Sequence, residues 1–123
     1  MNKIKVCIWG RNFELPVVYQ NYPGEDITEN QQNTCKTIPM VDYNAAKLEV
    51  IKYVKKFFTD DNSEDELTNI FRFVMPTSIV VPRADDSRIF AIMCKFKLDM
   101  EHGIGIIFEN AQFKETGPQD LIL

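Results

Sequence analysis

The chain has 123 residues, of which 45% are hydrophobic and 26% charged, and this is the size and apolar content of one domain spanning residues 1–123. Five glycines and six prolines are too few for a collagen-like or low-complexity chain. The net charge of −4 and the scattered basic residues argue against a nucleic-acid binder. A basic protein partner is the better electrostatic match.

The N-terminal residues alternate between polar and apolar side chains over Lys3 to Trp9, and a second apolar run covers Phe13 to Tyr19. This pattern predicts a β-hairpin. Pro16 predicts that the second strand lies at an edge or begins after the proline. The polar segment Gln20–Thr37 shows neither helical nor strand periodicity, so we expect a long loop there, used for binding or mobile.

One long and one short helix are predicted next. Apolar residues recur at helical spacing from Tyr43 to Phe58, with Asp42 placed to cap the first turn. Ser63 and Glu66 form a capping-box pattern that predicts a shorter helix through about Arg72, ended by Pro76.

The C-terminal half changes to the alternation of β-strands. Runs rich in Val, Ile and Phe are broken by polar turns at residues 78–81, 88–98, 103–109 and 112–115. The sequence therefore predicts an α+β fold with an N-terminal β-hairpin, one long and one short helix and a C-terminal antiparallel β-meander, with the helices on one face of the sheet.

Nothing in the composition indicates export or a membrane. The longest apolar runs are far shorter than the roughly 20 residues of a membrane-spanning helix, and the first residues do not resemble a signal peptide. We expect a cytoplasmic protein without a membrane partner. Of the three cysteines, Cys7 and Cys94 lie in apolar runs and are expected in the core, whereas Cys35 is the one placed to react.

The segment from Asp99 to Gly105 joins two carboxylates to the single histidine of the chain. Asp99, Glu101 and His102 are residue types that bind zinc or manganese, so a metal-dependent hydrolase is one interpretation. A catalytic metal needs at least three convergent ligands, and no other histidine is present. A turn in which Asp99 bonds backbone amides and Gly103 has a positive φ is the structural interpretation, and we favour it. We therefore expect neither an enzyme nor a cofactor.

A second candidate is a group of acidic residues between the two predicted helices. Acids favour the first turn of a helix, which explains them without a partner. They also form a patch able to dock into a basic active site. The group consists of Asp60, Asp61, Glu64, Asp65 and Glu66.

The C-terminal third carries a distinctive run of residues. The stretch 99–106 reads Asp-Met-Glu-His-Gly-Ile-Gly-Ile and is followed by Phe108, Asn110 and Gly-Pro-Gln-Asp at 117–120. This pattern resembles a family of small bacterial domains of unknown function. The resemblance covers residues 76–123, and the signature carries no catalytic role.

Members of that family often look like immunity proteins encoded beside secreted or contact-delivered bacterial toxins. The resemblance thus implies a protein of contact-dependent growth inhibition that binds a cognate toxin, for example a nuclease, through the acidic group at 60–66 or the turn carrying Asp99, Glu101 and His102. The alternative to an immunity protein is a stand-alone cytosolic binding or regulatory protein, for instance a homodimer. The sequence does not fix the oligomeric state.

Overall fold

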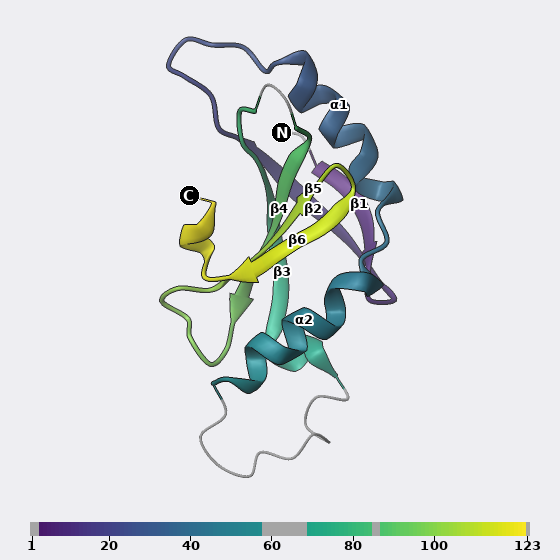
Figure 1. The fold of residues 1–123 in the computed structure, drawn as a ribbon, viewed down its shortest axis with the longest axis vertical. Helices are drawn as coiled ribbons and strands as arrows, with labels where there is room; N and C mark the ends of the chain where they lie inside the picture. Colours follow the sequence, from purple (N-terminus) through teal and green to yellow (C-terminus); the bar gives the residue numbers. More distant parts are fainter. Residues whose placement is uncertain (1–2, 58–68, 85–86, 123) are drawn as a thin grey trace.

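The computed structural model describes residues 3–57, 69–84 and 87–122 (Figure 1). Its strands are β1 (Lys3–Ile8), β2 (Arg11–Tyr19), β3 (Val74–Val81), β4 (Ile89–Phe96), β5 (Ile104–Glu109) and β6 (Gln112–Gly117). Its helices are α1 (Glu29–Thr37) and α2 (Asn44–Lys55), with short 3₁₀ helices η1 (Ile38–Met40), η3 (Ile70–Arg72) and η4 (Gln119–Leu121).

The strands form one six-stranded sheet in the order β1-β2-β3-β4-β5-β6. All neighbours are antiparallel except β2 and β3, which pair in parallel over Val17–Tyr19 and Ile79–Val81. A parallel pair requires a crossover connection, and the segment between β2 and β3 contains both α-helices. The predicted α+β fold, with its N-terminal hairpin and C-terminal antiparallel strands, is confirmed.

The two-residue turns of the β1–β2 and β5–β6 hairpins use residues with positive φ. Trp9 and Gly10 (φ 51° and 82°) join β1 to β2, and Asn110 and Ala111 (φ 52° and 68°) join β5 to β6. Two successive positive φ angles characterise the type I′ turn, whose twist matches that of the flanking strands. The Trp9 ring is fixed further by a hydrogen bond from Nε1 to the carbonyl oxygen of Tyr43 (3.0 Å).

Two prolines, Pro16 and Pro76, lie within strands, at positions where the sheet does not need a backbone N–H donor. Pro16 precedes Val17, the residue at which β2 begins to pair with β3, so β2 runs through the proline and does not begin after it. Pro76 lies within β3 at a register shift between Pro76 and Ser78. The prediction that Pro76 ends a helix is therefore wrong, because β3 already begins at Val74.

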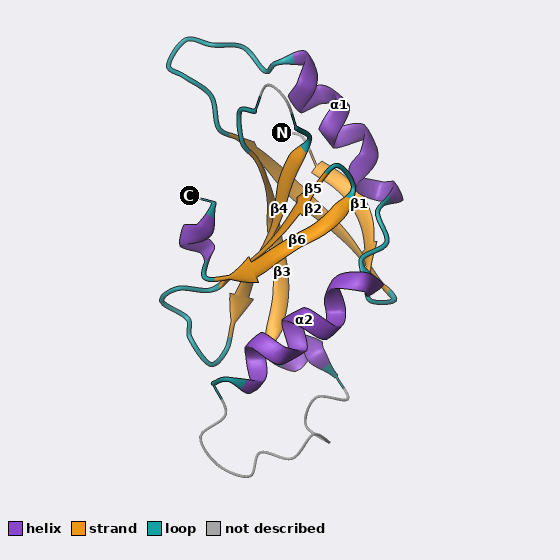
Figure 2. Ribbon diagram, viewed as in Figure 1, coloured by secondary structure: helices purple, strands orange, loops and turns teal. Residues whose placement is uncertain are grey.

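The main core lies between the sheet and the helices, which cover one face of the sheet (Figure 2). Val50 and Val54 of α2 are fully buried in it. Phe90 and Phe108 of neighbouring strands stack with ring centroids 5.0 Å apart. On the other face a smaller cluster forms around Ala91 and Met93, against which Ile122 near the C-terminus packs.

Residues 29–37 form helix α1, where the sequence predicted part of a long loop. The long helix is confirmed but begins at Asn44 and ends at Lys55. Asp42 accepts a hydrogen bond from the backbone N–H of Asn44 (3.0 Å), although Tyr43 holds the N-cap position. Of the predicted shorter helix, residues 63–68 lie outside the described residues, and η3 occupies its last turn.

Within the described ranges, the structure has no helix with the length and apolar character needed to cross a membrane.

Candidate functional site: an ordered surface loop and an acidic corner

The connection between β2 and α1, residues 20–28, reverses direction at a tight turn. The backbone N–H of Glu25 donates to the carbonyl oxygen of Tyr22 (2.9 Å), and Gly24 has a φ of 81°. Proline followed by glycine at the two central positions is the sequence preference of a type II turn. We refer to residues 20–28 as the 20–28 loop.

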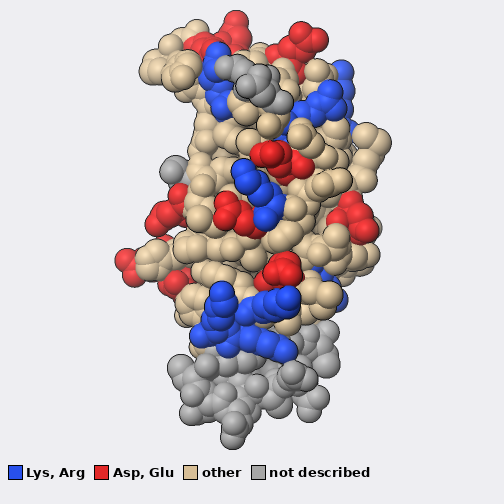
Figure 3. Space-filling view, in the orientation of Figure 1, with Lys and Arg blue, Asp and Glu red and all other residues tan. Residues whose placement is uncertain are grey.

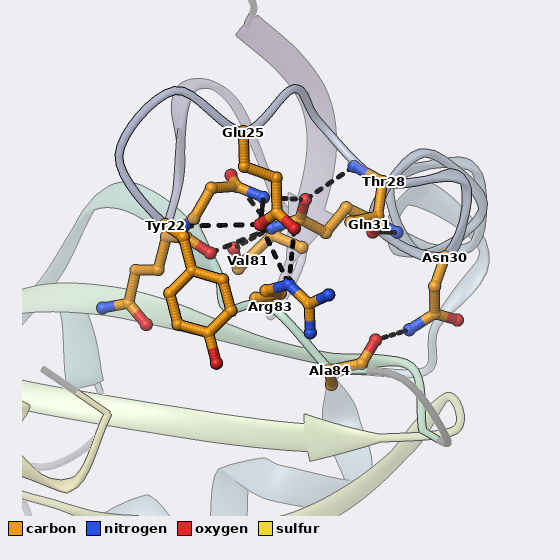
Figure 4. A network of polar contacts seen from close by, with 10 residues as sticks. Tyr22, Glu25, Thr28, Asn30, Gln31, Val81, Arg83 and Ala84 are labelled. Atoms are coloured by element: carbon orange, nitrogen blue, oxygen red, sulfur yellow. Dashed lines mark hydrogen bonds and ion pairs between the residues drawn. The ribbon is translucent and has the colours of Figure 1, made fainter.

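Gln31, in the first turn of α1, holds the 20–28 loop from within (Figure 4). Its side chain is fully buried. Its Oε1 accepts hydrogen bonds from Asn21 Nδ2 (2.7 Å) and from the backbone N–H of Thr28 (2.9 Å). Its Nε2 donates to the carbonyl oxygens of Gln20 and Val81, each at 3.2 Å. A buried amide with all these partners fixes the loop in one conformation, because displacing any of them leaves a buried polar group unpaired.

Thr28 completes the same structure as the N-cap of α1. Its Oγ1 accepts a hydrogen bond from the backbone N–H of Gln31 (3.1 Å), so Thr28 and Gln31 form a reciprocal capping box. The first turn of α1 thereby provides hydrogen-bond partners for the end of the helix and for the loop that leads into it.

An ion pair closes the outer side of the loop. Arg83 Nε, just beyond β3, lies 2.8 Å from Oε2 and 2.9 Å from Oε1 of Glu25. The hydrogen bond from Arg83 lowers the pKa of Glu25, with further contributions from Asn21 and the backbone of Tyr22. The Arg83 guanidinium lies 5.0 Å from the centroid of the Tyr22 ring, within the range of a cation–π contact.

Tyr22 itself is 67% exposed. It lines a shallow pocket of about 260 Å³ together with Gln20, Asn21, Pro82 and Arg83. An exposed tyrosine above an arginine, both held in place by the backbone beneath them, combines the residue types that most often dominate protein–protein binding energy. The 20–28 loop can therefore act as a preformed contact surface.

Asn30 of α1 extends this network to the β3–β4 connection. Its Nδ2 donates to the carbonyl oxygens of Ala84 (2.6 Å) and Ser87 (2.8 Å). The loop, the start of α1 and the end of β3 are thus joined by polar contacts.

The sequence-predicted residues Asp99, Glu101 and His102 lie in the turn between β4 and β5, well separated in sequence from the 20–28 loop. His102 Nδ1 hydrogen-bonds to both carboxylate oxygens of Asp99, at 3.1 and 3.0 Å. This bond, followed by the charge of Asp99, raises the pKa of His102, and Glu101 and Asp120 act in the same direction. We call Asp99, Glu101 and Asp120, whose charges all raise the pKa of His102, the acidic corner.

Gly103 has the positive φ that the sequence predicted for a turn at this position. Its φ is 62°, and a Cβ there would approach Gln119 Nε2 to 2.7 Å and the Cys94 carbonyl oxygen to 2.9 Å. Gln119 Nε2 donates to that carbonyl (3.1 Å), and the Gln119 backbone N–H donates to the His102 carbonyl oxygen (3.0 Å). The Glu-His-Gly segment therefore docks the C-terminal residues against β4.

No three His, Cys, Asp or Glu side chains of residues 3–57, 69–84 and 87–122 are grouped so that they could hold a metal ion. The acidic residues Asp60, Asp61, Glu64, Asp65 and Glu66 lie outside the described residues.

The cysteines differ in part from expectation. Cys94 is fully buried, and burial raises the pKa of its thiol. Cys35 is half-buried, with its Sγ 3.2 Å from the Tyr19 hydroxyl. Cys7 is exposed, so the expectation of a core position is wrong, because its side chain alternates with those of the buried Val6 and Ile8.

The whole chain, residues 1–123, matches a family described as a domain of unknown function, DUF6985. The protein belongs to this family. Neither the curated proteins nor the solved structures contain a significant match to the chain.

Proposed function

We propose that this protein is a bacterial immunity protein of the cytoplasm that binds a cognate toxin domain and neutralises it by blocking the active site or the path of the substrate. The observation that carries the proposal is the buried Gln31 network, which fixes the 20–28 loop while leaving Tyr22 exposed. An inhibitor gains affinity when its contact loop is already ordered, since binding then costs less conformational entropy.

The acidic corner supports the choice of a basic partner. Asp99 is oriented by its bond to His102, and Glu101 and Asp120 are close enough to raise the pKa of the same imidazole. A toxin that acts on nucleic acid must bind phosphates and therefore has a basic active site. Carboxylates facing such a site speed association and oppose wrong partners through complementary charge.

Co-expression with the reading frame immediately upstream tests the proposal. We expect a stable stoichiometric complex, and we expect the upstream product to kill cells only when this protein is absent. A harmless upstream product and no complex would contradict the proposal. In that case elution of the purified protein as a homodimer would favour the alternative, a stand-alone regulatory protein.

Two variants test separately what the 20–28 loop and the acidic corner contribute to binding. Tyr22→Ala should weaken the complex mainly by faster dissociation, whereas Asp99→Asn with Glu101→Gln should mainly slow association and reduce its dependence on salt. Glu14→Gln, at an exposed position of β2, is the control for loss of a negative charge. Equal kinetics for wild type and both variants would place the interface elsewhere.

A further inference from the structure

A groove separates helix α2 from strand β6 at one border of the sheet. It has a volume of about 320 Å³. Its lining comes from Lys52 and Tyr53 of α2, from the C-cap residue Lys56, and from β6, with Phe113, Lys114 and Thr116. None of these residues belongs to the 20–28 loop or to the acidic corner.

β6 is an edge strand. Among the described strands it pairs with β5 alone, and it is the last strand in the sheet order. Every second residue of an edge strand turns its backbone N–H and C=O away from the sheet, where they can pair with an added strand. An edge strand beside a helix is the geometry in which extended peptides bind by adding a strand to a sheet.

Three lysines and two glutamates line the groove, a small excess of positive charge in a chain whose net charge is −4. Lys and Arg side chains gather over the end of α2 in Figure 3. Lys52 and Lys55 lie in the last turn of α2, Lys56 follows as its C-cap, and Lys114 lines the groove from β6. Glu49 and Glu115 also line the groove, so its charge is too sparse and too mixed for a nucleic-acid backbone.

The ion pairs already present do not close the groove to a ligand. Lys52 Nζ lies 3.3 Å from Glu49 Oε1, and Lys114 Nζ lies 3.3 Å from Glu109 Oε2. The two lysine side chains are 70% and 51% exposed. Exposed pairs of this kind are weak, so a carboxylate of a ligand can replace Glu49 or Glu109 as the partner of the lysine.

Two aromatic side chains that pack against the core, Phe113 and Tyr53, form the floor of the groove. Phe113 packs edge-on against the buried Phe108, with ring centroids 6.2 Å apart, and Tyr53 packs against Phe96 at 6.0 Å. Side chains at alternate positions of an added strand would face this floor, while those between them would face water.

We propose that the groove between α2 and β6 binds an extended acidic segment of a partner protein, which adds a strand to the edge of β6 while its carboxylates pair with Lys52, Lys56 and Lys114. The proposal is independent of the toxin-binding function, because it concerns a different surface and is tested without any toxin.

The test uses a fluorescent peptide of alternating glutamate and threonine, about six residues long, which is the usual length of one strand. Two other probes accompany it. A Glu-Pro peptide with the same number of glutamates and with consecutive prolines keeps the charge but lacks N–H groups on both of its edges. A single-stranded oligonucleotide of matched charge tests for general attraction of polyanions.

We expect the Glu-Thr peptide to bind the wild-type protein and to slow amide hydrogen exchange in Gln112–Gly117. The Lys52→Gln/Lys56→Gln variant and the Glu-Pro peptide should each weaken binding about tenfold, as expected when several weak charge pairs or the backbone ladder are lost. Lys36→Gln, at an exposed position of α1, should bind like the wild type.

Three results would overturn the proposal: no binding of the Glu-Thr peptide, equal binding of the Glu-Pro peptide or oligonucleotide, or full affinity in the double variant. Because Lys52 and Lys56 are exposed, the variants should fold normally, and their unfolding midpoints verify this.

Discussion

Gln31 Nε2 donates a hydrogen bond to the carbonyl oxygen of Val81 at 3.2 Å, which ties the first turn of α1 to the last residue of the central strand β3. The same amide group bonds to the backbone at Gln20 and Thr28. One buried side chain therefore positions a loop, a helix and a strand relative to one another. Its removal should affect all three.

Gln31→Met tests this role with little change in side-chain volume. The substitution removes the partner of the Thr28 N–H and of the Gln20 carbonyl and one of the two donors to the Val81 carbonyl, so we expect a loss of about 2–4 kcal/mol in the free energy of unfolding. Urea denaturation measures it. The control is Gln32→Met at the exposed neighbouring position, which should stay within about 0.5 kcal/mol of wild type. Equal midpoints for the two variants would refute the role of Gln31.

Gly103→Ala should be destabilising for two reasons, the positive φ and the collision of a Cβ with Gln119 and the Cys94 carbonyl. Gly24→Ala provides the matched comparison, because Gly24 also has a positive φ but no atom within 4 Å of the added Cβ. We expect about 1 kcal/mol for Gly24→Ala and clearly more, about 2–4 kcal/mol, for Gly103→Ala. Thermal unfolding of both variants measures these losses of stability. Similar losses in the two variants would show that the close approach of Gln119 to Gly103 does not contribute to stability.

Much of the fold follows from local patterns. Alternation over Arg88–Leu98 predicts β4, because one face of the strand is apolar throughout, although in the structure β4 is buried on both faces. The helical stripe beginning at Tyr43 predicts α2, which buries one apolar side. Helix α1 has no such stripe, since its buried residues are Gln31 and Thr34. Periodicity therefore missed it, although Thr28 and Gln31 have the spacing of a capping box. The parallel pairing of β2 with β3 joins residues far apart in sequence, and no local signal encodes it.

The candidate site was predictable only where its contacts join residues close together in the sequence. Asp99 and His102 are neighbours along the chain, and their turn was recognised. Arg83 meets Glu25 across 58 positions of sequence, so only the fold reveals that pair. The tetrapeptide beginning at Tyr22, with its Pro-Gly centre, was the available signal for a turn.

The pairing of His102 with Asp99 predicts a pH-dependent contribution to stability. The pKa of His102 is raised above its ordinary 6.5, so the protonated imidazole is favoured in the folded protein. The contribution is fully present below about pH 6.5 and is lost as the pH rises through the pKa of the folded state. Asp99→Asn should return the pKa of His102 toward 6.5. NMR titration reads this directly because the chain has a single histidine, and an unchanged titration in the variant would contradict the assignment.

In the proposed complex, the Gln31 network presents Tyr22 to the toxin in a fixed position. The most direct test is the calorimetric affinity of wild type and Tyr22→Ala for the purified product of the upstream gene, with unfolding midpoints measured in parallel. We expect Tyr22→Ala to bind about 30-fold more weakly or worse, which corresponds to about 2 kcal/mol, and to unfold like the wild type. A variant with wild-type affinity would contradict the claim.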